Sequence, residues 1–168
     1  LFRKFFNSSI KIRIENFYIY ASNQKNKTSH ALLKKCNFDD QNELMLIKKI
    51  SRNKKIFLLD CGCNYGFYSF YTASLSKNNF VISFEASLKT ADDFNKNLLL
   101  NNFENTILKN LAISDIDNKK LTFNESIYDW ESSLTHSNFA ENRLTTINTT
   151  TIDSTLKEHS LYDRFLFI

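Results

Sequence analysis

LLDCGCNYGFYS, residues 58–69, contains both glycines of a 168-residue chain that has no proline. Residues 55–60, with the apolar run Ile56 to Leu59, predict a buried strand, and residues 65–76 predict a helix. Gly62 and Gly66 lie between them, where glycine permits a sharp turn and a close approach of the backbone to a neighbour. A strand, a glycine-containing loop and a helix in this order are typical of the first turn of a nucleotide-binding α/β unit.

The spacing within the loop indicates which ligand it could hold. A dinucleotide fingerprint has the form G-x-G-x-x-G, and its central glycine admits a pyrophosphate to the helix N-terminus. Here the form is D-x-G-x-N-x-G, with Asn64 at the position of that glycine. Glu85 ends the next predicted strand, 25 residues after Asp60, where a carboxylate can accept hydrogen bonds from two ribose hydroxyls. The pattern predicts a ligand with a ribose and without a pyrophosphate.

S-adenosylmethionine fits this description. Its ribose would lie at Glu85, and its methionine part would lie over Gly62 with the ammonium group near Asp60. Its adenine would lie beside the end of the third strand, around Asn110 and Ala112. A simpler interpretation also remains, in which the glycines only relieve strain in a turn and Glu85 is a surface carboxylate at a strand end.

The predicted elements alternate between strand and helix. They are expected over residues 55–60, 65–76, 80–84, 90–101 and 106–111. Such alternation is the signature of an α/β fold with a mostly parallel sheet and flanking helices. Thr90 and Asp93 resemble a capping box at the start of the second helix.

The residues before this core predict a smaller unit. Alternating apolar residues over 10–20 indicate two short strands, and helical spacing over 42–51 indicates a helix. We therefore expect accessory strands and a helix over residues 1–52. A Rossmann-like, ligand-binding domain is expected over residues 53–168.

The residues after the core are less regular. Two more strands are expected over residues 120–123 and 144–148, on either side of a polar loop that contains Trp130 and His136. The chain then ends in the apolar stretch DRFLFI, residues 163–168. Because a parallel strand rarely ends a chain inside a core, we expect the sequence to be a fragment that stops within a strand.

The composition restricts the classes of partner. A formal net charge of +4, with 22 basic and 18 acidic residues, is a mild basic excess that does not call for nucleic acid. The apolar runs are too short to span a bilayer, and no signal peptide is visible, so we expect a cytoplasmic protein without a membrane segment.

The cysteines favour a reducing compartment. Cys61 and Cys63 are separated by one residue, which is poor geometry for a mutual disulfide, and Cys36 leaves an odd set. Together with His30 they match no strong zinc spacing, so no metal site is predicted.

The motifs in their order resemble those of a known family. LLDCGCNYGFYS is followed by VISFEAS, NKNLLLNNFENTILKNLAISD, TTIDSTL and DRFLFI. Over residues 57–168 this order is similar to that of the FkbM family of S-adenosylmethionine-dependent methyltransferases. That family has a D-x-G-A-N-x-G loop, an F-E-P strand end, an N-x-x-L-N helix, an A-L-S-D segment and a T-L-D-x-L stretch before a K-I-D-x-E-G strand. Cys63 and Ala86 stand in place of the family's Ala and Pro.

The resemblance implies a Rossmann-like class I methyltransferase fold that is incomplete at its C-terminus, since the family continues beyond the position of Ile168. It implies methylation of a hydroxyl on a saccharide or small molecule, with S-adenosylmethionine as cofactor. It assigns no catalytic base; His136 and Trp130 are candidates for a base and for contact with the acceptor. The cofactor-binding positions that it implies are Asp60, Gly62, Asn64, Gly66, Glu85, Asn110 and Ala112.

Two other functions remain open. A nicotinamide-dependent oxidoreductase would bind NAD more tightly than S-adenosylmethionine, although its third glycine is missing here. A noncatalytic module that keeps the fold would bind a partner such as RNA, with an affinity that falls steeply with salt.

Overall fold

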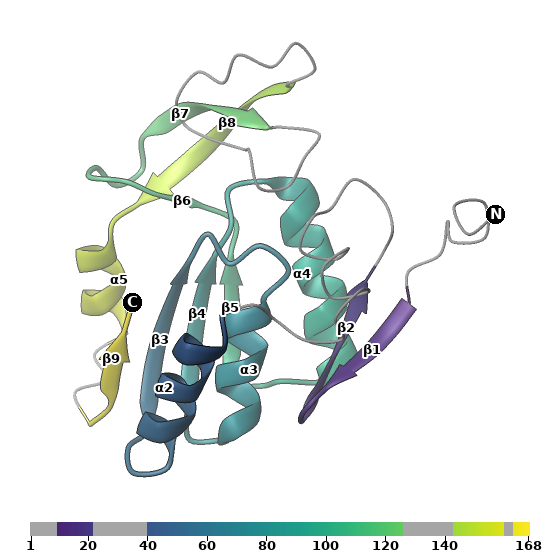
Figure 1. Cartoon of the computed structure of the whole chain (residues 1–168). Coiled ribbons are helices and arrows are strands. Elements are labelled where there is room, and N and C mark those ends of the chain that lie inside the picture. Colours follow the sequence, from purple (N-terminus) through teal and green to yellow (C-terminus); the bar gives the residue numbers. More distant parts are fainter. Residues whose placement is uncertain (1–9, 22–39, 126–142, 160–162) are drawn as a thin grey trace, which may run out of the picture.

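The central sheet has four parallel strands in the order β5-β4-β3-β9 within the residues that the structure describes (Figure 1). The structure is a computed structural model that describes residues 10–21, 40–125, 143–159 and 163–168. The four strands are β3 (Ile56–Cys61), β4 (Phe80–Phe84), β5 (Thr106–Lys109) and β9 (Phe165–Phe167). β4 and β9 lie on opposite sides of β3, so the sheet has a topological switch point beside β3. The predicted α/β fold with a mostly parallel sheet is confirmed.

Helices cover both faces of this sheet. Successive strand residues point to opposite sides, so alternate residues pack against different helices. Ile56 and Leu58 pack with residues of α2 (Gln41–Ser51), α3 (Phe67–Leu75) and α4 (Leu88–Asn101). The alternate residues Phe57 and Leu59 pack with Ile152 of α5 (Ile152–Glu158) in a second cluster. The strands are therefore apolar on both faces, which explains why β3 and β4 appear in the sequence as continuous apolar runs.

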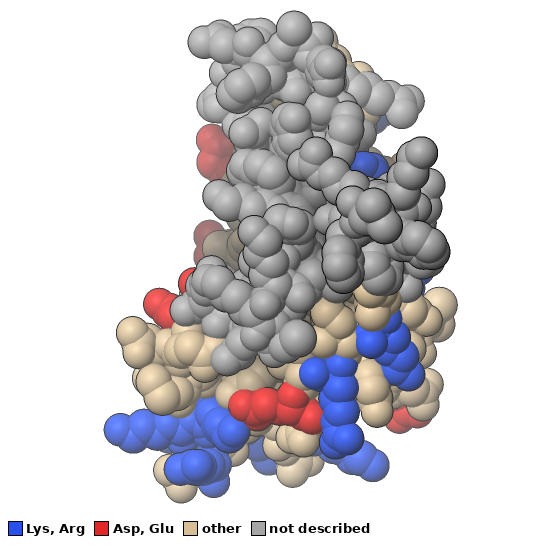
Figure 2. Space-filling view, turned by 45° about the vertical axis from the view of Figure 1, so that its right-hand side comes forward, with Lys and Arg blue, Asp and Glu red and all other residues tan. Residues whose placement is uncertain are grey.

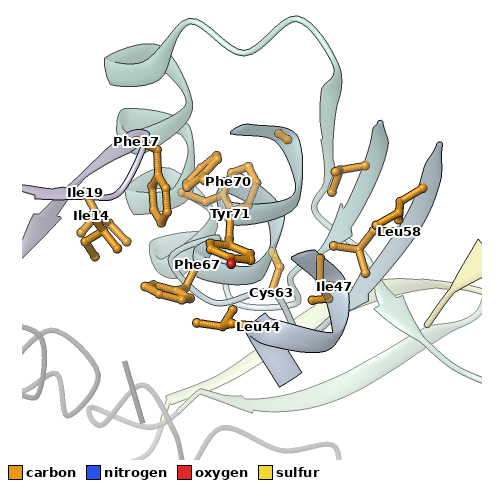
Figure 3. Packing of buried hydrophobic residues seen from close by; sticks show 14 of the residues in the cluster. Ile14, Phe17, Ile19, Leu44, Ile47, Leu58, Cys63, Phe67, Phe70 and Tyr71 are labelled. Atoms are coloured by element: carbon orange, nitrogen blue, oxygen red, sulfur yellow. The ribbon is translucent and has the colours of Figure 1, made fainter. Parts of the chain in front are cut away.

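A hairpin of β1 (Ile10–Ile14) and β2 (Phe17–Ala21) packs into the first of these clusters (Figure 3). Phe17 and Ile19 have no exposed surface, and the Phe17 ring centroid lies 5.6 Å from that of Phe67 in α3. The two strands predicted over residues 10–20 are confirmed, and they share a core with β3 and α3.

Asparagine side chains tie the same hairpin to α4. Asn101 Oδ1 accepts from the Tyr18 N–H at 2.6 Å, and Asn97 Oδ1 accepts from the Tyr20 N–H at 2.8 Å. These bonds satisfy backbone donors of β2 that would otherwise be unpaired at the edge of the hairpin.

A second, smaller sheet has the order β6-β8-β7 among the described residues. It consists of β6 (Ala112–Ile113), β7 (Lys120–Glu125) and β8 (Arg143–Thr150), with β7 antiparallel and β6 parallel to β8. The two late strands expected from the sequence are confirmed. Trp130 and His136 lie outside the described residues.

The short helix α5 follows β8 and was not predicted. Thr151 Oγ1 accepts from the Ser154 N–H at 3.1 Å and caps it. Asp117 adds a second anchor, since its carboxylate accepts from the Thr151 N–H at 2.7 Å and from Ser154 Oγ at 2.5 Å. Thr150 Oγ1 donates to the same carboxylate at 3.1 Å. The start of α5 is thus held by a residue more than thirty positions earlier in the chain.

Two predicted boundaries were wrong for local reasons. Helix α4 begins at Leu88, because Ser87 in an extended conformation is its N-cap and accepts from the Thr90 N–H at 3.2 Å. The capping box expected at Thr90 and Asp93 is therefore not the cap. β5 ends at Lys109 and not at residue 111, because the Leu111 N–H turns back to the Lys109 carbonyl oxygen at 2.9 Å, and Asn110 Nδ2 donates to the Glu85 carbonyl oxygen just after β4.

Charge and hydropathy add little to the function. Positive and negative side chains lie close to each other on the described surface that Figure 2 shows, without a large patch of one sign. No helix in the described part of the chain is long and apolar enough to cross a membrane.

Candidate cofactor site

The loop between β3 and α3 has a left-handed backbone at three positions. The φ angles are 80° at Gly62, 51° at Asn64 and 85° at Gly66. Glycine adopts this region without strain, and asparagine tolerates it better than most residues. The loop lies at the carboxyl end of β3 beside the switch point, which is where open α/β sheets bind their ligands.

The two glycines have different surroundings. A Cβ added to Gly62 would meet no atom within 4 Å, so the backbone there is open to an approaching ligand. A Cβ added to Gly66 would lie 2.5 Å from ring atoms of Phe70 and Phe94. The close neighbour of Gly66 is therefore the aromatic core between α3 and α4.

The backbone N–H groups of the loop donate within the protein. Gly62 and Cys63 both donate to the carbonyl oxygen of Phe84 at 2.9 Å. Asn64 donates to Glu85 Oε2 at 3.0 Å. A pyrophosphate at a helix N-terminus needs such N–H groups for itself. Because these donors are already engaged, the loop is poorly suited to a dinucleotide.

Glu85, directly after β4, holds the loop with its carboxylate. Its Oε2 accepts from Asn64, and its Oε1 accepts from the Ser87 N–H at 2.9 Å. Burial raises the pKa of Glu85, and the bonds from the backbone of Ser87, Asn64 and Ala86 oppose this rise. An ionised carboxylate has about four acceptor sites, so capacity remains for a ligand hydroxyl.

Asp60 lies near the end of β3 and is supported from behind by two serines. Ser69 Oγ in α3 donates to Asp60 Oδ2 at 2.5 Å. Ser69 Oγ also lies 2.7 Å from Ser83 Oγ in β4. Ser83 is the residue that pairs with Asp60 in the sheet. Burial raises the pKa of Asp60, and the bonds from Ser69 oppose this rise.

Asn64 carries a buried acceptor that the protein does not use. Its side-chain Oδ1 has no hydrogen-bond partner among the described residues. Such an unsatisfied group costs about 1–3 kcal/mol, which a ligand donor at this position would remove. Together with the open side of Gly62, this acceptor fits a ligand that brings hydroxyl or ammonium donors.

The two positions expected near adenine have other contacts. Asn110 Nδ2 donates to the carbonyl oxygens of Glu85 at 2.7 Å and Ala86 at 3.2 Å, so it supports the strand end that carries Glu85. Ala112 is buried in a small cluster with Phe123 of β7, against which Ala86 packs.

The fold brings together Asp60, Gly62, Asn64 and Glu85 at the carboxyl ends of two neighbouring strands. Sequence reasoning missed Ser69 and Ser83. A signal for them exists, since each is a polar residue within an otherwise apolar segment, FYSFY in α3 and FVISF in β4.

The cysteines of the loop are unbridged. Cys61 is exposed and Cys63 is buried, and burial followed by the charge of Asp60 raises the pKa of both thiols. In the described ranges, no group of three His, Cys, Asp or Glu residues could hold a metal ion. Cys36 and His30 lie outside those ranges.

No family model matches the chain, and no curated protein sequence matches it closely. Solved structures of methyltransferases do resemble it. The SAM-dependent methyltransferase from Agrobacterium tumefaciens is 10% identical with a TM-score of 0.49, and the match covers 63% of this chain and 33% of that one. TYW2 from P. horikoshii in complex with MeSAdo is 11% identical with a TM-score of 0.45, covering 70% and 52%. The rRNA methylase from Streptococcus thermophilus is 16% identical with a TM-score of 0.40, covering 45% and 41%.

These matches concern the fold. All three TM-scores are below 0.5, and the chain spans only 33% to 52% of the length of the matched structures. The mostly parallel sheet with flanking helices, which the sequence predicted, is established by the strand order and register of the chain itself. None of the matches is specific to the FkbM family.

Proposed function

We propose that this chain carries the cofactor site of an S-adenosylmethionine-dependent methyltransferase. One observation supports this above the others: Asp60 lies at the carboxyl end of β3 and Glu85 directly follows the adjacent parallel strand β4, with the open Gly62 backbone in the loop after β3. The N–H groups of Gly62 and Asn64 are already engaged by the protein. A ligand with an ammonium group and ribose hydroxyls suits these acceptors, whereas a pyrophosphate does not.

Each residue would contribute one interaction with the cofactor. Asp60 would face the ammonium group, Glu85 the ribose hydroxyls, and Asn64 Oδ1 a further donor. Gly62 leaves room for the methionine part. The cofactor itself supplies the activated methyl group when bound. The protein's part is to hold this donor in line with the acceptor.

The finer assignment comes from the sequence motifs alone. LLDCGCNYGFYS and VISFEAS resemble motifs of the FkbM family. On this resemblance we propose O-methylation of a hydroxyl on a saccharide or small molecule as the reaction. Gly66, Asn110 and Ala112 complete the proposed cofactor-binding set. Their contacts suggest support of the site for Gly66 and Asn110. A cytoplasmic location is part of the same proposal.

Isothermal titration calorimetry with three ligands tests the proposal. We expect saturable binding of S-adenosylmethionine and S-adenosylhomocysteine to the chain, and none of NAD at the same concentration. Tighter binding of NAD would support an oxidoreductase instead. If none of the three ligands binds, and the chain binds polyanions with an affinity that falls steeply with salt, the result would support the noncatalytic module.

A further inference from the structure

Two buried serines form a hydrogen-bond chain that ends on the Asp60 carboxylate. Ser69 Oγ lies 2.5 Å from Asp60 Oδ2 and 2.7 Å from Ser83 Oγ, and neither serine has exposed surface. The Ser69 hydroxyl has one proton, which an ionised carboxylate takes as an acceptor. Ser83 must then donate to Ser69. The chain therefore runs in one direction, from Ser83 through Ser69 to Asp60.

The three residues come from three different elements. Asp60 is in β3, Ser69 is in α3, and Ser83 is in β4 directly opposite Asp60 in the parallel ladder. The carboxylate is therefore held from the core side of the sheet and not by the ligand loop. Hydrogen bonds from a hydroxyl to an ionised carboxylate are short, and they are roughly twice as strong as neutral ones.

We propose that Ser69, supported by Ser83, is a positioning residue that fixes the Asp60 carboxylate in the orientation and charge state that a ligand ammonium group requires. This inference rests on the proposed function, because it takes the ammonium group of S-adenosylmethionine as the partner of Asp60. Ser69 does not touch the ligand; it acts through Asp60.

Four titratable groups among the described residues interact electrostatically with Asp60. They are Glu85 after β4, Tyr68 on α3, and Cys61 and Cys63 beside the loop. Burial raises the pKa of both thiols and of Tyr68 above their ordinary values, so none of the three gains a charge as the pH falls from about 8 to 5. Asp60 and Glu85 are the groups left to titrate as the pH falls.

The variant Ser69→Ala distinguishes the titration of Asp60 from that of Glu85. It removes a donor to the ionised form of Asp60 only, so the pKa of Asp60 rises further and the ammonium partner is lost at a higher pH. We expect S-adenosylhomocysteine to bind about tenfold more weakly to the variant at pH 6 and to lose less affinity at pH 8. Ser69→Thr, which keeps the hydroxyl, should restore the wild-type pH profile, and Ser83→Ala should give a smaller shift in the same direction.

A second ligand distinguishes positioning from simple damage to the fold. 5′-Methylthioadenosine has the ribose and adenine but no ammonium group, so its affinity should be the same for the wild type and Ser69→Ala at every pH. Ser74→Ala is the matched control: its hydroxyl lies on the same helix and donates to the Tyr71 carbonyl oxygen at 2.8 Å, away from Asp60. Calorimetry of both ligands from about pH 5 to 8 gives all the affinities.

The outcomes separate this inference from the proposed function. If the wild type binds S-adenosylhomocysteine and Ser69→Ala leaves the pH profile unchanged, the positioning role is wrong and the cofactor site stands. If Ser69→Ala weakens 5′-methylthioadenosine by the same factor, the serine is only structural and the inference also fails. If the wild type binds neither ligand, the proposed function itself is wrong.

Discussion

The backbone N–H of Asn64 donates to Glu85 Oε2 at 3.0 Å, although the two residues are 21 positions apart. This bond joins the loop after β3 to the end of β4. The second carboxylate oxygen of Glu85 accepts from Ser87, the N-cap of α4. One side chain therefore organises three segments at the carboxyl edge of the sheet, before any ligand arrives.

Replacing Glu85 by alanine should weaken cofactor binding by about 1.5–3 kcal/mol, because charge-assisted hydrogen bonds to the ribose are lost. Glu85→Gln should be nearly as harmful, since its NH₂ group would face the N–H donors of Asn64 or Ser87. Titration calorimetry with S-adenosylhomocysteine measures both. Glu104→Ala, at an exposed glutamate after α4, is the control. An unchanged affinity in Glu85→Ala would remove this residue from the site.

The two glycines should respond differently to alanine. Each has a left-handed backbone, so alanine costs roughly 1–2 kcal/mol of stability at either position. At Gly66 the new Cβ also collides with the rings of Phe70 and Phe94, which adds about 1–3 kcal/mol. Urea denaturation should rank Gly66→Ala as the less stable variant. Equal stability of Gly62→Ala and Gly66→Ala would contradict the packing at Gly66. The variant Gly62→Val should lose ligand affinity but keep the fold.

Replacing Phe17 by alanine should destabilise the whole chain by about 3–5 kcal/mol, because this ring of β2 is fully buried against Phe67 and Phe70 of α3. Urea unfolding followed by circular dichroism should still show one transition. Tyr20→Ala, at a partly exposed position on the same strand, should have little effect. A separate early transition in Phe17→Ala would instead support residues 1–52 as an independent accessory unit.

Asp117→Asn should lower the melting temperature at neutral pH, with a difference that becomes smaller in acid. Hydrogen bonds from Ser154 and Thr151 hold the pKa of Asp117 below its usual 3.8 in the folded state. A lowered pKa contributes stability above the unfolded value, and this contribution is lost as the pH falls through the folded value. Thermal melts at about pH 7 and at about pH 3 measure it. Asp92→Asn, at an exposed position on α4, is the control and should leave the melting temperature at about pH 7 close to that of the wild type.

The alternation of strands and helices could be predicted from the sequence because it is a local signal. The apolar runs of β3 and β4 and the helical spacing in α2 and α4 each indicate one element without knowledge of the rest. The glycine loop was visible in the same way. The start of α4 was not, since Ser87 and Thr90 are both good caps and only the backbone conformation at Ser87 decides between them.

Contacts between distant segments could not be predicted. The chain from Ser83 through Ser69 to Asp60 depends on the register of β3 against β4 and on the rotation of α3. Helix α5 is short, and its start depends on Asp117, which lies in the connection between β6 and β7. The sequence indicated Asp60 and Glu85 as acceptors and carried polar residues within apolar segments at Ser69 and Ser83, but no local pattern shows that these serines meet Asp60.

The Gly66 backbone packs directly against the Phe94 ring, so the loop between β3 and α3 is in contact with the aromatic core. A side chain that enlarges this part of the core presses on the Gly66 backbone, because a Cβ at Gly66 would already lie 2.5 Å from ring atoms of Phe70 and Phe94. If the loop binds the cofactor as we propose, substitutions among the core phenylalanines change ligand affinity as well as stability. Residues 28 positions from the loop glycine, such as Phe94, would evolve together with it.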